Sequence, residues 1–261
     1  MENVYLYAAL VVSIYFIIFF IIGQILRDNS IVDVGWGLGF AVLAAALALR
    51  DEFQNTKGIV VLVLVSLWGL RLTIYLFQRN VGKPEDFRYV NLRKRWGNNW
   101  ALLKSFLNVY FLQGVVLYIV SLSFMYIFNS ETSELIWFDY VAIAIWVIGF
   151  LFESIGDYQL KVFKANPENK GCIIQSGLWK YTRHPNYFGN ATMWWGIYLL
   201  AITSGGWLTF FSPLTMTLFL LFVSGVPLLE KKKANHPEYQ QYKQVTPKFF
   251  PWFPKSKGMN G

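Results

Sequence analysis

Long apolar segments alternate with short polar ones along the whole chain. Seven apolar segments stand out, at about residues 4–26, 31–49, 58–77, 106–128, 136–153, 187–203 and 207–229. Each is close to the roughly 20 residues that an α-helix needs to cross the hydrocarbon core of a bilayer. The pattern predicts an all-α integral membrane protein with seven transmembrane helices, folded as a single membrane domain over residues 1–261.

The composition agrees with this interpretation and excludes an ordinary soluble domain. Hydrophobic residues make up 55% of the 261 positions and charged residues only 15%, against about 25% charged residues in soluble domains. The first apolar segment lacks the basic start and the small-residue cleavage site of a signal peptide. We therefore expect it to remain as a transmembrane helix.

The positions of Lys and Arg predict an orientation. With the N-terminus outside, 20 of the 23 basic residues fall in inside segments, whereas the outside segments hold only Arg50 and Lys57. Cytoplasmic loops of membrane proteins carry such an excess. The pattern predicts the N-terminus outside and the C-terminus in the cytoplasm. It also attributes the net charge of +8 to these loops and to anionic lipids, not to nucleic acid.

Cysteine and histidine are too scarce for a disulfide or for a metal site. Cys172 is the only cysteine, and the two histidines, His184 and His236, lie far apart in the sequence. The segment Gly35–Gly39 resembles a dinucleotide fingerprint, but it lies in an apolar helix with no strand before it. We expect neither a metal ion nor a Rossmann-type site.

Four ionisable side chains are expected inside or beside the membrane. Asp33, Arg71, Glu153 and Asp157 all fall near the inner ends of predicted helices. Such residues are costly there and mark functional sites by default. A structural ion pair between Asp33 and Arg71, or lipid headgroup binding, is the alternative.

Glu153, Asp157, Lys161 and Lys164 recur at spacings of four, four and three residues. Residues with these spacings share one face of a helix. The face is either solvated and ion-paired, or it presents carboxylates to hydroxyl groups of a ligand and lysines to its phosphates.

The stretch from Gly177 to Asn190 concentrates the remaining polar chemistry. Pro185 favours a helix start, where backbone N–H groups and the helix dipole attract anions. Arg183 and His184 precede it, and Arg binds phosphate in a bidentate manner. Asn186, Tyr187 and Asn190 follow and can hydrogen-bond an amide or a ribose. The alternative is a bare interfacial anchor for the helix.

The last polar segment combines charge and aromatic residues. Glu230 and three lysines come first, Tyr239, Tyr242 and Lys243 follow, and the segment closes with Phe249-Phe-Pro-Trp-Phe253. We expect it to be folded and to close over a cofactor as a lid.

Two motifs carry a family resemblance. Arg183-His-Pro-Asn-Tyr-Phe-Gly-Asn190, after Gly177-Leu-Trp179, resembles the motif of membrane-embedded sterol reductases. Its Arg-His-Pro-x-Tyr core is also similar to that of isoprenylcysteine carboxyl methyltransferases, which bind S-adenosylmethionine. Residues 28–36 and Trp68-Gly-Leu-Arg71 resemble bacterial steroid 5-alpha-reductase-like proteins of the DUF1295 type.

The resemblance to 5-alpha-reductases implies NADPH as cofactor, in a cofactor-binding half at residues 150–253. It implies hydride delivery to the β carbon of a lipophilic enone and protonation of the α carbon, in a bacterial cytoplasmic membrane. Asp33 matches the acid that holds the substrate carbonyl. Trp68 stands near the place of its tyrosine partner, and Tyr75 lies two turns further on. The expected cofactor-binding residues are Glu153, Asp157, Lys161, Lys164, Tyr181, Arg183, His184, Asn186, Tyr187, Asn190, Glu230, Tyr242 and Lys243.

Three functions stay open at this point. The first is an NADPH-dependent oxidoreductase acting on a CH–CH bond, as a 3-oxo-5-alpha-steroid 4-dehydrogenase does. The second is an S-adenosylmethionine-dependent methyltransferase of a lipophilic substrate. The third is a lipid-binding protein without catalysis. The five basic residues of segment 154–186 favour NADPH, because its phosphates require convergent cations.

Overall fold

The computed structural model describes residues 3–97, 99–132 and 134–255, and within these ranges it contains helices and turns but no strand. Six helical segments are long and apolar enough to cross a membrane: Val4–Leu26, Ile31–Arg50, Thr56–Asn80, Ala101–Asn129, Trp137–Ala165 and Trp207–Lys232. The all-α multi-pass architecture expected from the sequence is confirmed at this level. The one remaining expected segment, 187–203, corresponds to the helix α8 (Pro185–Ile202). It is not among the six, because it is less apolar.

The chain divides into two compact units, which we describe separately. Unit 1 holds the described residues up to Ile136 together with Leu200–Ser212, and unit 2 holds Trp137–Leu199 and the described residues from Pro213 onward. Except for residues 200–212, the expected cofactor-binding half 150–253 lies in unit 2.

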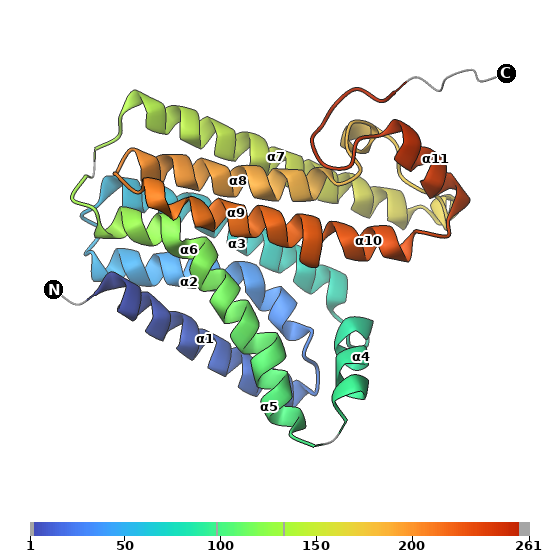
Figure 1. Ribbon diagram of the computed structural model, residues 1–261, viewed down its shortest axis with the longest axis horizontal. Coiled ribbons are helices and arrows are strands. Elements are labelled where there is room, and N and C mark those ends of the chain that lie inside the picture. The colour runs from blue at the N-terminus through green and yellow to red at the C-terminus, as the bar shows by residue number, and fades with distance from the viewer. Residues whose placement is uncertain (1–2, 98, 133, 256–261) are drawn as a thin grey trace. The chain divides into compact units, whose positions relative to one another are not determined.

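Unit 1 is built on helices α1 to α6. They are α1 (Val4–Leu26), α2 (Ile31–Arg50), α3 (Thr56–Asn80), α4 (Phe87–Trp96), α5 (Ala101–Ser105), the π-helical stretch η1 (Phe106–Phe111) and α6 (Leu112–Asn129). The helix α2 packs against α1, α3 and α6, and the short α4 packs beside α5 (Figure 1). The short helix η4 (Trp207–Phe210) also belongs to this unit.

A pair of glycines lets α2 and α3 approach closely. A Cβ added to Gly37 would lie 2.5 Å from the carbonyl oxygen of Gly69, and one added to Gly69 would lie 2.3 Å from that of Gly37. The two backbones are therefore in direct contact, and larger residues would separate them.

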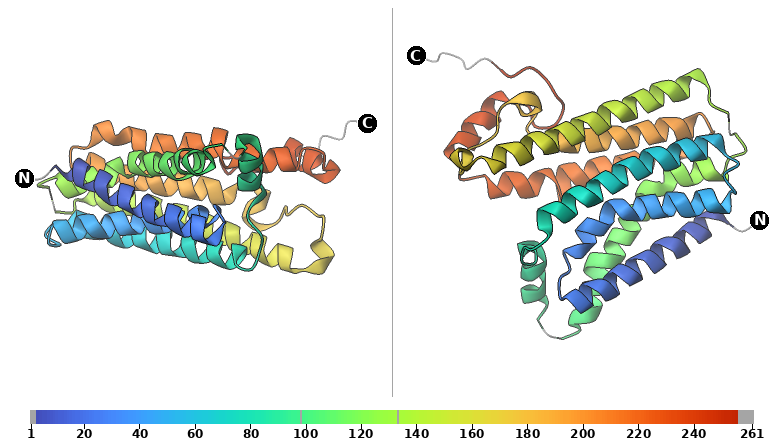
Figure 2. Two further views of the ribbon diagram at one scale, coloured as in Figure 1. Left: turned by 90° about the horizontal axis from the view of Figure 1, so that it is seen from below. Right: turned by 180° about the vertical axis from the view of Figure 1, so that it is seen from behind.

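Unit 2 is built on a long helix, α7 (Trp137–Ala165), which lies beside α8 in all views (Figures 1 and 2). Its other elements are η2 (Pro167–Asn169), η3 (Gly177–Lys180), α9 (Phe211–Leu218), the π-helical η5 (Phe219–Val223), α10 (Val226–Lys232) and α11 (Pro237–Val245). Two residues of α9 and three of α8 fall in unit 1.

The helix α7 extends well beyond the apolar segment that we expected to end at residue 153. It continues to Ala165, so Glu153, Asp157, Lys161 and Lys164 do belong to one helix, as their spacing predicted. Gly149 and Gly189 provide the close contact with α8, since a Cβ on Gly149 would lie 2.6 Å from the Gly189 carbonyl oxygen.

Candidate functional site

Two buried carboxylates of α7 meet two asparagines of α8. Asn190 Nδ2 donates to Glu153 Oε2 at 3.0 Å, and Asn186 Nδ2 donates to Asp157 Oδ1 at 3.0 Å. The two pairs repeat at four-residue intervals on both helices, which places them one turn apart. We call these two pairs the α7–α8 ladder. Glu153 and Asp157 are only 3% and 4% exposed. A buried carboxylate needs hydrogen-bond donors, and the asparagines supply them.

Some buried polar atoms of Asn190 and of the two residues before α8 have hydrogen-bonding capacity left. Asn190 Oδ1, Arg183 Nε and His184 Nδ1 are buried and have no hydrogen-bond partner among the described residues. Such atoms are uncommon in folded proteins and call for an explanation, such as a ligand. They offer one acceptor from Asn190, one donor from Arg183 and one ring nitrogen from His184.

Arg183 is held by an ion pair. Its Nη2 lies 2.8 Å from Glu230 Oε1, and its Nη1 donates to the Lys243 carbonyl at 3.4 Å. The Lys243 ammonium lies 4.0 Å from Glu230 Oε2. Glu230 therefore compensates much of the positive charge here, and a phosphate contact of Arg183 stays a prediction.

His184 is almost fully buried beside the same carboxylate. Its Nε2 lies 3.5 Å from Glu230 Oε1, and its ring stacks on Tyr187 with 5.7 Å between centroids. Burial lowers the pKa of His184, although Glu230 acts in the opposite direction. We therefore expect a neutral imidazole near neutral pH.

Residues 246–253, which we call the tail strap, hold the segment before α8. The backbone N–H of Arg183 donates to the Pro247 carbonyl at 3.0 Å. The Thr182 hydroxyl donates to the Phe249 carbonyl at 2.8 Å, and Tyr181 packs edge-on against Phe253. The segment expected as a lid is thus folded against residues 181–183.

Tyr242 also helps to hold the segment before α8. Its hydroxyl donates to the carbonyls of Trp179 and Thr182, and burial raises its pKa. The sequence marked Tyr242 as a cofactor residue. In the structure its hydroxyl positions the segment that carries Arg183, and a direct role stays a prediction.

In unit 1, Asp33 meets two residues that the sequence analysis did not single out. Arg88 Nη2 pairs with Asp33 Oδ2, and the buried Tyr89 hydroxyl donates to Asp33 Oδ1 at 2.6 Å. Burial and the Asp33 charge raise the pKa of Tyr89 well above its usual range. The two residues belong to α4, a short basic helix. The sequence analysis used its Lys and Arg residues only to predict the orientation in the membrane.

The other two expected catalytic residues lie on α3. Trp68 is buried and packs edge-on against Phe40 of α2, with 5.4 Å between centroids. Tyr75 lies under the guanidinium of Arg71 at 5.6 Å. Their roles in catalysis stay predictions. In the part of the chain that the structure describes, no three His, Cys, Asp or Glu residues are grouped so as to hold a metal ion.

Comparison with known proteins adds two kinds of match. The model of a family described as a protein of unknown function (DUF1295) matches residues 19–246. An uncharacterized protein of Schizosaccharomyces pombe is 25% identical over 267 aligned residues, which cover 89% of this chain and 77% of that protein. A probable O-methyltransferase of Ustilaginoidea virens is 42% identical over 62 residues, only 24% of this chain and 21% of that protein. No solved structure matches.

Proposed function

The chain belongs to the DUF1295 family, a group of steroid 5-alpha-reductase-like membrane proteins, and we propose that it is an NADPH-dependent reductase. Its proposed substrate is a carbon–carbon double bond in a lipophilic enone or steroid-like molecule. The observation that carries the proposal is the set of buried polar atoms without partners on Arg183, His184 and Asn190.

This set suits the nicotinamide half of the cofactor. Asn190 Oδ1 can accept from a carboxamide NH₂ group, and Arg183 Nε and a neutral His184 offer further hydrogen bonds to ribose or phosphate oxygens. Glu153 fixes Asn190 by accepting the 3.0 Å hydrogen bond that Asn190 Nδ2 donates, so the amide oxygen is left for the ligand.

The residues of the chain would position the cofactor and exclude water from it. The cofactor would supply the hydride, as nicotinamide cofactors do. Asn190 is 8% exposed and His184 is 2% exposed, so a ligand bound to them would be largely shielded from water. On the substrate side we propose Asp33, with Tyr89 as the hydroxyl that it positions.

A methyltransferase is the second candidate, and one observation favours it. The local match to a probable O-methyltransferase reaches 42% identity, and an enzyme of that kind needs a methyl donor. S-adenosylmethionine carries a sulfonium cation and a carboxylate but no phosphate. The five basic residues of segment 154–186 suit the phosphates of NADPH better than they suit this cation.

We expect the purified protein to bind NADPH and not S-adenosylmethionine. The change that tests the site is Asn190→Ala, which removes the acceptor proposed for the ligand. A hydrogen bond of this kind contributes about 1–2 kcal/mol, so NADPH affinity should fall about tenfold. Isothermal titration in detergent would measure both dissociation constants.

Asn235→Ala provides the matched control, because Asn235 is an exposed asparagine of the same unit. It should leave NADPH affinity unchanged. Binding of S-adenosylmethionine without NADPH would replace our proposal by the methyltransferase. Binding of neither ligand would leave the lipid-binding function.

A further inference from the structure

The tail strap carries three large aromatic side chains that its own fold leaves uncovered. Phe250, Trp252 and Phe253 are 71%, 72% and 72% exposed, whereas Phe249 beside them in the chain is buried. Exposed apolar surface that is grouped in this way marks a contact with a partner or with a membrane. We call these three side chains the aromatic edge of the strap.

The backbone under the aromatic edge is held at several points. The N–H of Trp252 donates to the Tyr181 carbonyl at 2.9 Å, and the N–H of Lys255 donates to the Val245 carbonyl at 2.9 Å. These bonds add to the two that the strap accepts from Thr182 and Arg183. The exposed rings are therefore presented in a fixed arrangement, and a surface that is already ordered loses little conformational entropy on binding.

The aromatic edge lies beside the end of the membrane span of α7. The ring of Phe250 packs edge-on against Phe188 of α8, with 6.1 Å between centroids. Phe188 in turn packs edge-on against Phe152 of α7 at 5.2 Å. The helix α7 is long and apolar enough to cross a membrane, and a span of about 20 residues that begins at Trp137 ends about one turn beyond Phe152. This position is the level of the lipid headgroups.

Positive charge surrounds the aromatic edge. Lys180, Lys248 and Lys255 are exposed, and residues 246–255 include no Asp or Glu. The Lys180 ammonium lies over the ring of Tyr181, at 5.9 Å from the centroid. Aromatic rings with a polar edge favour the membrane–water interface, and lysines near it are attracted to anionic lipids. The charge thus complements an anionic lipid surface.

We propose that the aromatic edge inserts into the interface of an anionic lipid leaflet, while Lys180, Lys248 and Lys255 contact the headgroups. The hydrogen bonds of the strap transmit this anchoring to residues 181–183. The segment that carries Arg183 is therefore held most firmly in a membrane that contains anionic lipid. Anchoring of this kind is independent of the reaction that the site catalyses.

A spin label tests the depth of the aromatic edge. The label is attached to Phe250→Cys in a Cys172→Ser background, and the full chain is placed in nanodiscs that contain phosphatidylglycerol and phosphatidylcholine. Paramagnetic resonance should show a label that oxygen reaches more readily than a water-soluble nickel chelate does. Gln241→Cys is the matched control, because Gln241 is an exposed polar residue of α11, and it should show the reverse order.

Two results would overturn the membrane contact. Preference of the Phe250→Cys label for the nickel chelate would show that the aromatic edge faces water. Occlusion of the label from both reagents would assign the edge to a contact with a second copy of the chain.

Hydrogen exchange tests the role of charge. In peptides that cover residues 181–183 and 247–253, amide exchange should be about fivefold slower in nanodiscs with phosphatidylglycerol than in pure phosphatidylcholine. Lys248→Gln should remove most of this difference. Equal exchange of the wild type in both kinds of nanodisc would show that the strap does not recognise anionic lipid.

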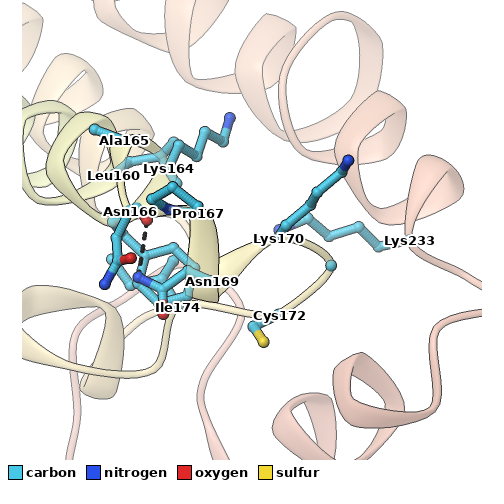
Figure 3. A pocket seen from close by; sticks show the side chains of 12 residues that line it. Leu160, Lys164, Ala165, Asn166, Pro167, Asn169, Lys170, Cys172, Ile174 and Lys233 are labelled. Carbon is cyan, nitrogen blue, oxygen red and sulfur yellow. Dashed lines mark hydrogen bonds between the residues drawn. The ribbon is translucent and has the colours of Figure 1, made fainter.

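Lys170→Gln is the matched control for charge. Lys170 is an exposed lysine of the same unit, but together with Lys164 and Lys233 it lines a cavity of about 520 Å³ at the end of α7 (Figure 3). The residues that line this cavity include none of the strap. Lys170→Gln should therefore keep the difference between the two nanodiscs. If it removes the difference as Lys248→Gln does, the effect follows net charge and not the strap, and the proposal is wrong.

Discussion

At the scale of single residues, Glu230 brings together the buried Arg183 and His184 and the exposed Lys243 of unit 2. It lies within 2.8 Å of Arg183, 3.5 Å of His184 and 4.0 Å of Lys243. One carboxylate thus stands beside two charged groups and an imidazole whose pKa is lowered chiefly by burial. The protonation state of His184 is consequently linked to folding.

We predict that His184 makes the fold sensitive to acid. Its folded pKa is lowered, whereas an unfolded histidine takes up a proton near pH 6.5. Its contribution to the free energy of unfolding is therefore fully present above that pH and is lost as the pH falls below it. In His184→Gln, thermal unfolding in detergent should change less between pH 7 and pH 5 than in the wild type. Identical pH dependence in both proteins would contradict this account.

Spacing alone predicted which side chains share a helix face. Glu153 and Asp157 stand four apart on α7, and Asn186 and Asn190 stand four apart on α8. Their contacts across the two helices were not predicted, because spacing within one helix does not name its neighbour. Spacing could not give the partner of Arg183, because Glu230 is distant in sequence and reaches it only through tertiary packing. Arg88 and Tyr89 were not predicted as partners of Asp33 for a related reason. Basic residues in a loop are expected from the orientation of the helices alone, so they do not indicate a specific ion pair.

At the scale of helices, the ladder depends on how closely α7 and α8 approach. A Cβ on Gly189 would lie 2.4 Å from both the Glu153 nitrogen and the Gly149 oxygen. These are backbone atoms, which cannot turn aside as a flexible side chain can. The apolar pattern predicted both helices, but not that glycines set the distance between them.

Gly189→Ala should therefore separate α7 from α8. We expect a loss of stability of about 1–3 kcal/mol, typical of overpacking, and weaker NADPH binding because Asn190 moves away from Glu153. Gly156→Ala is the matched control on α7, since its added Cβ meets the Pro185 ring at 3.2 Å and should cost less. Thermal unfolding and nucleotide titration would measure both effects, and equal losses in the two variants would count against the glycine contact.

At the scale of the whole molecule, six helices of the described part of the chain are long and apolar enough to cross a membrane. The orientation remains a prediction from the Lys and Arg count. The sequence could supply this count because insertion depends on charge near the helix ends. Side-chain packing plays no part in it. The chain's single cysteine, Cys172, is exposed and offers a direct test.

If the C-terminal loops face the cytoplasm, a membrane-impermeant maleimide should label Cys172 in inverted vesicles and not in intact cells. Glu131→Cys in a Cys172→Ser background should give the opposite pattern, because residue 131 lies in a loop expected outside. Cys172→Ser alone should remain unlabelled in both preparations. Labelling of Cys172 in intact cells would reverse the predicted topology.

The tail strap also has a consequence for biosynthesis. Phe249 of the strap accepts a hydrogen bond from Thr182, and the two residues are 67 positions apart in the chain. At about 5–20 residues per second, a ribosome needs roughly 3–13 s to make that stretch. The segment before α8 thus enters the nascent protein before its hydrogen-bonding partners exist. A premature stop codon shortly before Pro247 would consequently yield a chain with every long apolar helix but without the strap that holds Arg183.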